Sequence, residues 1–168
     1  MLCAMTAIAL RAHTFNTVFS FDRTDGNYPP AAWSRPPMGF VWHNQLWGTN
    51  IAGTVFKMTP TGTLTTTYTF GVAPKGGYYP IGGLIQAING DLYGTTEYGG
   101  AGDGTVFKIT PSGALTTLYS FCAQSGCTDG EILGAGLIQA TNGDFYGTTE
   151  YGGATTVARS SKSPRVAR

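Results

Sequence analysis

An internal repeat with a period of 51 to 53 residues limits the folds open to this sequence. Residues 82–101 read GGLIQAINGDLYGTTEYGGA and residues 135–154 read AGLIQATNGDFYGTTEYGGA, so 17 of 20 positions are identical at an offset of 53. Residues 53–70, GTVFKMTPTGTLTTTYTF, match residues 104–121, GTVFKITPSGALTTLYSF, at an offset of 51. Such self-similarity indicates an architecture of repeated supersecondary units.

Each unit predicts four short strands. Residues 137–140 lead through an Asn-Gly turn into residues 145–149, and Asn-Gly between apolar segments is a strong hairpin signal. A third strand is expected at residues 105–109, followed by a Pro-Ser-Gly turn and a fourth strand at residues 115–121. A total of 25 glycines and only 11% charged residues favour turns and uncharged strands over helices.

Both faces of the predicted sheet are partly apolar. In the third strand Phe107 and Ile109 lie on one face and Val106 lies on the other, because side chains alternate along a strand. A sheet with two apolar faces needs a neighbour on each side, as a blade of a propeller has. We predict an all-β, β-propeller-like tandem repeat of four-stranded antiparallel units, incomplete in this chain, with a β-solenoid as the alternative.

The sequence also resembles a known family. The strings YGTTEYGGAGDGTVFKITPSGALTTLYSF and CAQSGCTDG, which span residues 93–130, resemble the GloVer-type tandem repeats of choice-of-anchor bacterial proteins. The resemblance covers residues 17–154 with two interruptions, and residues 13–154 are taken as the repeat region. It implies an exported or surface-attached protein with a propeller-like fold. It brings no established activity and no catalytic residues.

The amino-terminal segment predicts export. Residues 1–10 are apolar and contain the small-residue pattern Ala7-Ile-Ala9, so residues 1–12 are expected to be a signal peptide that lacks its basic leader. A short buried strand is the alternative. No apolar run reaches the length of a membrane span, so none is expected. Secretion or display on a bacterial cell surface is the expected location.

Charge argues against nucleic acid as a partner. The chain has a formal net charge of +1, but four of its ten basic residues lie after residue 154. Residues 1–154 hold six basic and nine acidic residues, which gives 6 − 9 = −3. A mildly acidic body offers no electrostatic attraction for nucleic acid or an anionic membrane.

Three cysteines are present, and Cys3 would leave with the signal peptide. Cys122 and Cys127 flank a short loop that is expected to close as a disulfide in an exported protein. Neither His13 nor His43 lies at a metal-binding spacing from them. No cofactor or metal is therefore expected.

Two segments interrupt the repeat. Residues 155–168 stand where GTVFKITPSG should follow, and a nucleotide string that encodes residues 157–168 also encodes GTVFKITPSGT when it is translated from its third position. Residues 32–45 can likewise be encoded by strings that contain LVQATD and LYGTT in two other frames. We interpret residues 32–50 and 155–168 as out-of-frame translations, the second one disordered.

Alternatives to this interpretation give both segments a function. A basic, serine-rich tail is typical of a disordered interaction tail. All three tryptophans, Trp33, Trp42 and Trp47, fall within residues 32–50. Exposed aromatic side chains often mark binding surfaces, so these tryptophans could form a cluster that binds a sugar or a partner protein.

Most acidic residues have a structural interpretation. Asp91 and Asp144 are equivalent in successive units, as are Glu97 and Glu150, whereas a catalytic pair is needed only once. An aspartate after Asn-Gly is expected to cap the hairpin turn.

Two further aspartates lie in glycine-rich loops. Asp103 and Asp129 could offer oxygen ligands to calcium there, but neither loop has the spaced acids of a calcium-loop signature. Turn formation is the default interpretation of both.

Tyr98 and Tyr151 are the candidate ligand-binding residues. Each precedes the double glycine of its unit, and together they could form an aromatic row that stacks against a carbohydrate or a surface protein. Packing between units is the alternative role.

Three functions follow from the sequence. The first is a non-catalytic binding or scaffolding module, the second is an enzyme on a propeller scaffold that acts on carbohydrate, and the third is a frameshifted reading frame without a function. An enzyme should show non-repeated polar residues that converge on one site, and the sequence displays no such set. We therefore expect a protein that is not an enzyme and that is present here as a gene fragment. The frame analysis favours the third function for this chain and the first for its intact relatives.

Overall fold

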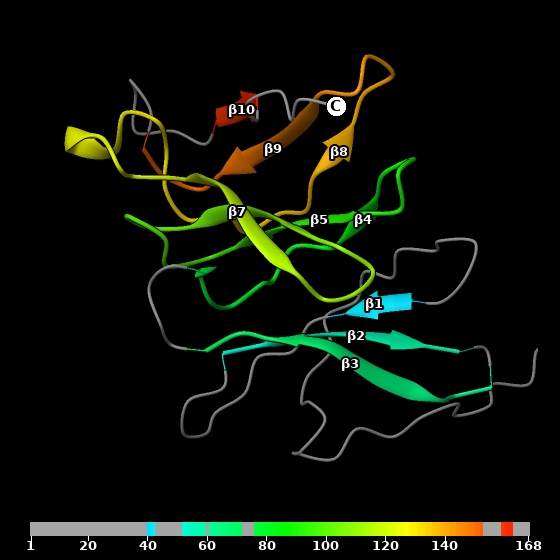
Figure 1. Cartoon of the computed structure of the whole chain (residues 1–168). Helices are drawn as coiled ribbons and strands as arrows, with labels where there is room; N and C mark the ends of the chain where they lie inside the picture. Colours follow the sequence, from blue (N-terminus) through cyan, green and yellow to red (C-terminus); the bar gives the residue numbers. More distant parts are fainter. Residues whose placement is uncertain (1–39, 43–51, 60, 72–75, 153–158, 163–168) are drawn as a thin grey trace, which may run out of the picture.

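The computed structural model describes residues 40–42, 52–59, 61–71, 76–152 and 159–162, which form three small antiparallel sheets (Figure 1). The first sheet has the strand order β1-β2-β3, the second β4-β5-β6-β7 and the third β10-β9-β8. In chain order the strands are β1 (Phe40–Trp42), β2 (Thr54–Met58), β3 (Leu64–Thr69), β4 (Ile85–Gln86), β5 (Leu92–Thr96), β6 (Thr105–Ile109), β7 (Leu115–Ser120), β8 (Ile138–Gln139), β9 (Phe145–Thr149) and β10 (Arg159–Lys162).

The predicted all-β repeat is confirmed. The described part of the chain contains no α-helix, and its one named helical element is the short 3-10 turn η2 (Ser125–Cys127). None of its helical segments is long and apolar enough to cross a membrane. The residues predicted to carry the signal peptide lie outside the described residues.

The second sheet is a complete four-stranded unit. Its strands follow one another in both sequence and space, with Leu92 opposite Ile109 and Thr96 opposite Thr105. The consecutive β6 residues Val106 and Phe107 pair with Tyr119 and Thr117, so Leu118 is the extra residue of a β-bulge in β7. The same irregularity lies opposite the equivalent residues of β2, so the bulge belongs to the repeated unit.

The sheets stack face to face, with the second between the other two (Figure 1). Between the first and second sheets lies one apolar cluster, formed by Val55, Phe70, Leu84, Leu92, Phe107 and Ile109. Between the second and third sheets lies another, formed by Tyr93, Val106, Phe121, Leu133, Leu137 and Phe145. The two apolar faces predicted for the unit therefore serve two separate cores.

Gly94 allows the first of these cores to close. A Cβ atom at this position would lie 2.4 Å from Leu84 Cδ2 and 2.7 Å from Phe107 Cζ, which is closer than van der Waals contact allows. The glycine in the middle of β5 therefore lets two large side chains pack directly against the backbone.

Both segments interpreted as out of frame contribute a strand at the position of a missing repeat strand. Phe40 in β1 lies opposite Met58, as Leu92 lies opposite Ile109 in the complete unit. The alternative frame aligns the leucine of LYGTT with this same Phe40.

The carboxy-terminal segment follows the same rule. Arg159 in β10 lies opposite Thr149, as Thr105 lies opposite Thr96 in the complete unit. The alternative frame aligns TVFK with residues 159–162. Within the tail expected to be disordered these four residues thus pair as a strand, and the rest of that tail lies outside the described residues.

The shared core predicts the effect of truncating Phe107, which is fully buried between the first and second sheets. Phe107→Ala should lower the free energy of unfolding by about 3–5 kcal/mol because it leaves a cavity. Ile88→Ala is the matched control, since Ile88 is fully exposed and its truncation should stay within about 0.5 kcal/mol of the parent. Urea denaturation followed by tryptophan fluorescence measures both, and equal effects would contradict the assignment of the core.

The positions of β1 and β10 agree with the frame hypothesis, which can be tested by sequencing the gene. Sequencing of independently isolated coding DNA through codons 30–50 and 155–168 should give corrected frames that encode LVQATD, LYGTT and GTVFKITPSG. If the present frame is reproduced in every isolate, the tryptophan cluster and the basic tail are genuine features of the chain.

Candidate functional site

Three tyrosines gather where the loop after β5 meets the segment before β4. The ring of Tyr98 stacks on that of Tyr78 with a centroid distance of 5.6 Å and an interplanar angle of 23°. Tyr79 lies edge-on to both, at 5.2 Å from Tyr78 and 6.1 Å from Tyr98. All three side chains are half-buried. We call Tyr78, Tyr79 and Tyr98 the tyrosine cluster.

Backbone pairing fixes the tyrosine cluster in place. The amide of Tyr78 donates to the carbonyl of Tyr98 at 2.8 Å, and the amide of Tyr98 donates back at 3.2 Å. The amide of Tyr79 donates to the carbonyl of Ala52 in the preceding unit at 2.8 Å. The cluster is thus anchored to two units, which reduces the conformational entropy that a ligand would have to remove on binding.

The second candidate, Tyr151, has different surroundings. It is 49% exposed and pairs through its backbone with Glu131, in the way that Tyr98 pairs with Tyr78. Glu131 and Ile132 therefore occupy the positions of Tyr78 and Tyr79, so the stacked arrangement is not repeated. Tyr98 and Tyr151 lie at equivalent places in successive units, but among the described residues only Tyr98 belongs to an aromatic cluster.

Sequence reasoning missed Tyr78 and Tyr79. Both lie in the connection between β3 and β4, outside the segments that recur with high identity. Only a comparison with Glu131 and Ile132 distinguishes them as a local change. The signal was therefore a difference between units rather than a repeated motif.

A glutamate accompanies each candidate tyrosine. The pKa of Tyr98 is raised above its usual value, first by a side-chain hydrogen bond to Glu97 and then by repulsion from that carboxylate. The pKa of Tyr151 is raised in the same way by Glu150. Each phenol thus stays protonated to higher pH than a free tyrosine. The site offers ring faces for stacking beside carboxylate oxygens that accept hydrogen bonds.

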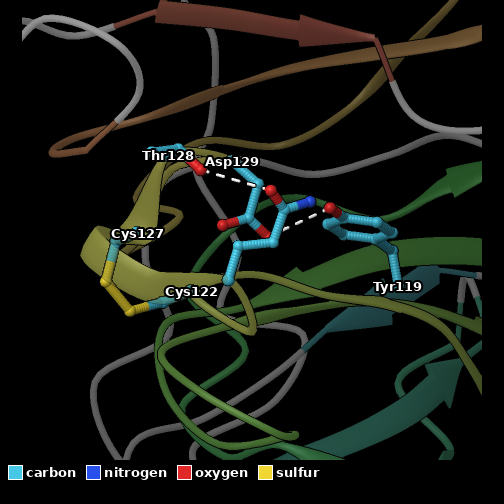
Figure 2. The surroundings of a disulfide bond; sticks show 6 residues. Tyr119, Cys122, Cys127, Thr128 and Asp129 are labelled. Atoms are coloured by element: carbon cyan, nitrogen blue, oxygen red, sulfur yellow. Dashed lines mark hydrogen bonds between the residues drawn. A yellow bond between two sulfur atoms is a disulfide. The ribbon is translucent and has the colours of Figure 1, made fainter.

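A disulfide closes the loop that follows β7 (Figure 2). It joins Cys122 to Cys127, the pair expected from the sequence. The amide of Cys122 donates to the carbonyl of Gly130 at 2.9 Å, and the hydroxyl of Thr128 donates to Gln124 Oε1 at 3.2 Å. The loop is therefore held by covalent and polar contacts rather than by an apolar core.

Asp129 anchors this loop to the second sheet. The hydroxyl of Tyr119, on β7, donates to Asp129 Oδ2 at 3.0 Å (Figure 2). The pKa of Tyr119 is raised, first by burial and then by this hydrogen bond. The carboxylate thus holds the disulfide loop in position, which agrees with a structural role.

The disulfide also determines what the nearby ligand atoms can do. Cys122, Cys127 and Glu131 bring one ligand atom each to within 4.8 Å of one another. Metal binding by cysteine needs the thiolate, and sulfur atoms that are bonded to each other cannot supply it. With the disulfide formed, Glu131 is the only ionic ligand of this group.

The remaining aspartates make structural contacts. The amide of Asp103 donates to the carbonyl of Phe121, and its own carbonyl accepts from Ile132, which joins two successive units. Asp91 accepts a hydrogen bond from Asn89 Nδ2 at 3.1 Å and forms an ion pair with Lys108 at 3.4 Å.

The hairpin contact of Asp91 recurs in the next unit. Asp144 accepts from Asn142 Nδ2 at 3.1 Å. The two recurring aspartates therefore stabilise the two Asn-Gly hairpins, in the same manner in each unit.

Loss of the disulfide should be measurable as a loss of stability. Replacement of both cysteines, Cys122→Ser with Cys127→Ser, removes the closure of a six-residue loop and should cost about 2 kcal/mol of unfolding free energy. Urea denaturation of the double variant measures the effect. Parent protein treated with a reductant should shift by the same amount, and an unchanged midpoint in both samples would contradict the pairing.

The repeat also identifies the family of the chain. Residues 4–159 match the family model described as the Gloeobacter/Verrucomicrobia repeat. Comparisons with curated proteins and with solved structures gave no match. The match covers most of the 168 residues and includes strands β1 to β9. The chain belongs to the Gloeobacter/Verrucomicrobia repeat family.

Proposed function

We propose that this chain is a non-catalytic binding module, exported or displayed on a bacterial surface, that recognises carbohydrate through the tyrosine cluster and Glu97. The stacked pair Tyr78–Tyr98 carries the proposal. The half-buried rings are held by backbone pairing and leave part of their surface accessible, and Glu97 beside them can accept hydrogen bonds from hydroxyl groups.

A propeller-like scaffold is part of this proposal. Three sheets that stack through two separate cores place successive loops beside one another, as the blades of a propeller do. The repeated sheets then provide a constant frame, and the loops between β3 and β4 and between β7 and β8 provide the variation. A binding surface on loops carried by a rigid frame is a common arrangement.

Export is supported by the chemistry of the loop after β7. A disulfide forms and persists in the periplasm and outside the cell, whereas the bacterial cytoplasm keeps thiols reduced. The Cys122–Cys127 bond therefore fits a protein that works in an oxidising compartment.

Binding to polysaccharide tests the proposal. The purified chain should be retained on at least one of cellulose, chitin or xylan in a pull-down assay. Tyr98→Ala should weaken that retention about tenfold, since an aromatic contact is worth about 1.4 kcal/mol. Tyr98→Phe should retain most of the affinity because it keeps the ring.

Tyr151→Ala is the matched control. It removes the same side chain from the equivalent position of the next unit, where no stacked tyrosine lies within the described residues, and it should leave retention unchanged. Urea midpoints equal to that of the parent show that the variants fold. If Tyr98→Ala and Tyr151→Ala bind as tightly as the parent, the tyrosine cluster is not the binding site.

A further inference from the structure

The second sheet is covered on both faces. Side chains of the third sheet cover the face that lies towards it. Tyr93, on β5, is 3% exposed and stacks on Phe145 of β9 with a centroid distance of 4.3 Å. Thr95, two residues further along β5, is 0% exposed. Its hydroxyl donates to the carbonyl of Ala135 in the next unit at 3.0 Å.

The equivalent face of the third sheet lacks such a cover. Tyr146, which corresponds to Tyr93, is only half-buried, and Thr148, which corresponds to Thr95, is exposed. Ile138 is 67% exposed, whereas its counterpart Ile85 is packed against the core between the second and third sheets. We call Ile138, Tyr146 and Thr148 the open face.

Elsewhere in the chain, the same face of one sheet always packs onto the preceding sheet. The face of the second sheet that carries Leu84 and Leu92 packs onto the first sheet. The corresponding face of the third sheet, with Leu137 and Phe145, packs onto the second sheet. The same kind of interface between sheets is therefore formed twice in succession. The open face corresponds to one side of a third such interface.

We propose that the open face binds a further unit of the same repeat, which docks through the apolar face that corresponds to Leu137 and Phe145. Tyr146 then stacks on the aromatic or leucine side chain of the incoming unit, as Tyr93 stacks on Phe145. The hydroxyl of Thr148 donates to a backbone carbonyl of that unit, as Thr95 donates to Ala135.

A second copy of the chain fits this face less well than a further unit does. The docking side chains of a copy would have to come from a face that is still uncovered. On the first sheet that face includes Phe56, the counterpart of Phe107, and Phe56 is buried. The docking faces of the second and third sheets are occupied within the chain.

Ala135 prevents the incoming unit from docking in the same geometry as the established interface between the second and third sheets. Gly82 lies at the established interface, where a Cβ atom would come within 2.7 Å of the Ala135 carbonyl oxygen. Ala135 itself occupies the position of Gly82 on the third sheet, so its methyl group would meet the incoming backbone. The incoming unit must therefore shift at this point, and Ala135→Gly should strengthen the docking.

The experiment appends a further unit. Residues 155–168 are replaced by a second copy of residues 102–153, which continues the repeat after Ala154. Exposure of the open face is measured by the rate at which iodoacetamide labels Thr148→Cys in a Cys3→Ser background. The matched control carries Leu137→Asp and Phe145→Asp in the appended copy only. Ile88→Cys reports a site that is exposed in every variant.

The expected result is a labelling rate at Thr148→Cys that is at least tenfold slower in the extended chain than in the present chain and the control. Ile88→Cys should label equally fast in all of them. Thr95→Cys, which lies at the established interface, should label slowly throughout and so shows that the existing units remain folded. Ala135→Gly should slow labelling at Thr148→Cys further.

Two results would overturn the proposal. The first is equal labelling of Thr148→Cys in the extended chain and its aspartate control while Thr95→Cys stays protected. The second is protection of Thr148→Cys in the unextended chain that increases with protein concentration, because it would identify a second copy as the occupant.

Discussion

Leu92 and Tyr93 are neighbours on β5, yet each lies in a different hydrophobic core. The alternation of side chains along a strand makes this unavoidable when both faces of a sheet are apolar. A single unit cannot bury both faces, so the free energy of folding depends on contacts between units. The stacking of the three sheets thus depends on the buried interfaces between them.

Small and β-branched residues make the close stacking of sheets feasible. Gly94 leaves room for Leu84 and Phe107, and Thr96 and Thr105 are buried with their hydroxyl oxygens 2.7 Å apart. A threonine pair satisfies its own polar groups across the strands while its methyl groups pack against neighbours. Buried threonines are therefore compatible with this interior where their hydroxyl groups are paired, as those of Thr96 and Thr105 are.

The all-β fold could be predicted because the motifs that determine it recur in successive units. The tyrosine cluster could not be predicted because the residues that form it do not recur. The Asn-Gly hairpins, the turn Pro-Thr-Gly or Pro-Ser-Gly and the apolar alternation appear in more than one unit, and they predict the four-stranded antiparallel sheet. The tyrosine cluster depends on Tyr78 and Tyr79, whose positions in the next unit are occupied by Glu131 and Ile132. A search for repeated motifs does not detect such a difference between units. The disulfide could be expected from the sequence because two cysteines that lie close together in the chain can pair without a tertiary contact.

Strand pairing and core packing place different demands on a sequence, and this difference explains the positions of β1 and β10. An antiparallel ladder is built from backbone amides and carbonyls, so most non-proline residues can extend it. The segments 40–42 and 159–162 lack the repeat sequence, yet each pairs in the register that the missing strand would have. The neighbouring strands β2 and β9 set this register through their own backbone groups. An edge strand can therefore be recruited by position alone, whereas the interface between sheets requires the side chains of the repeat.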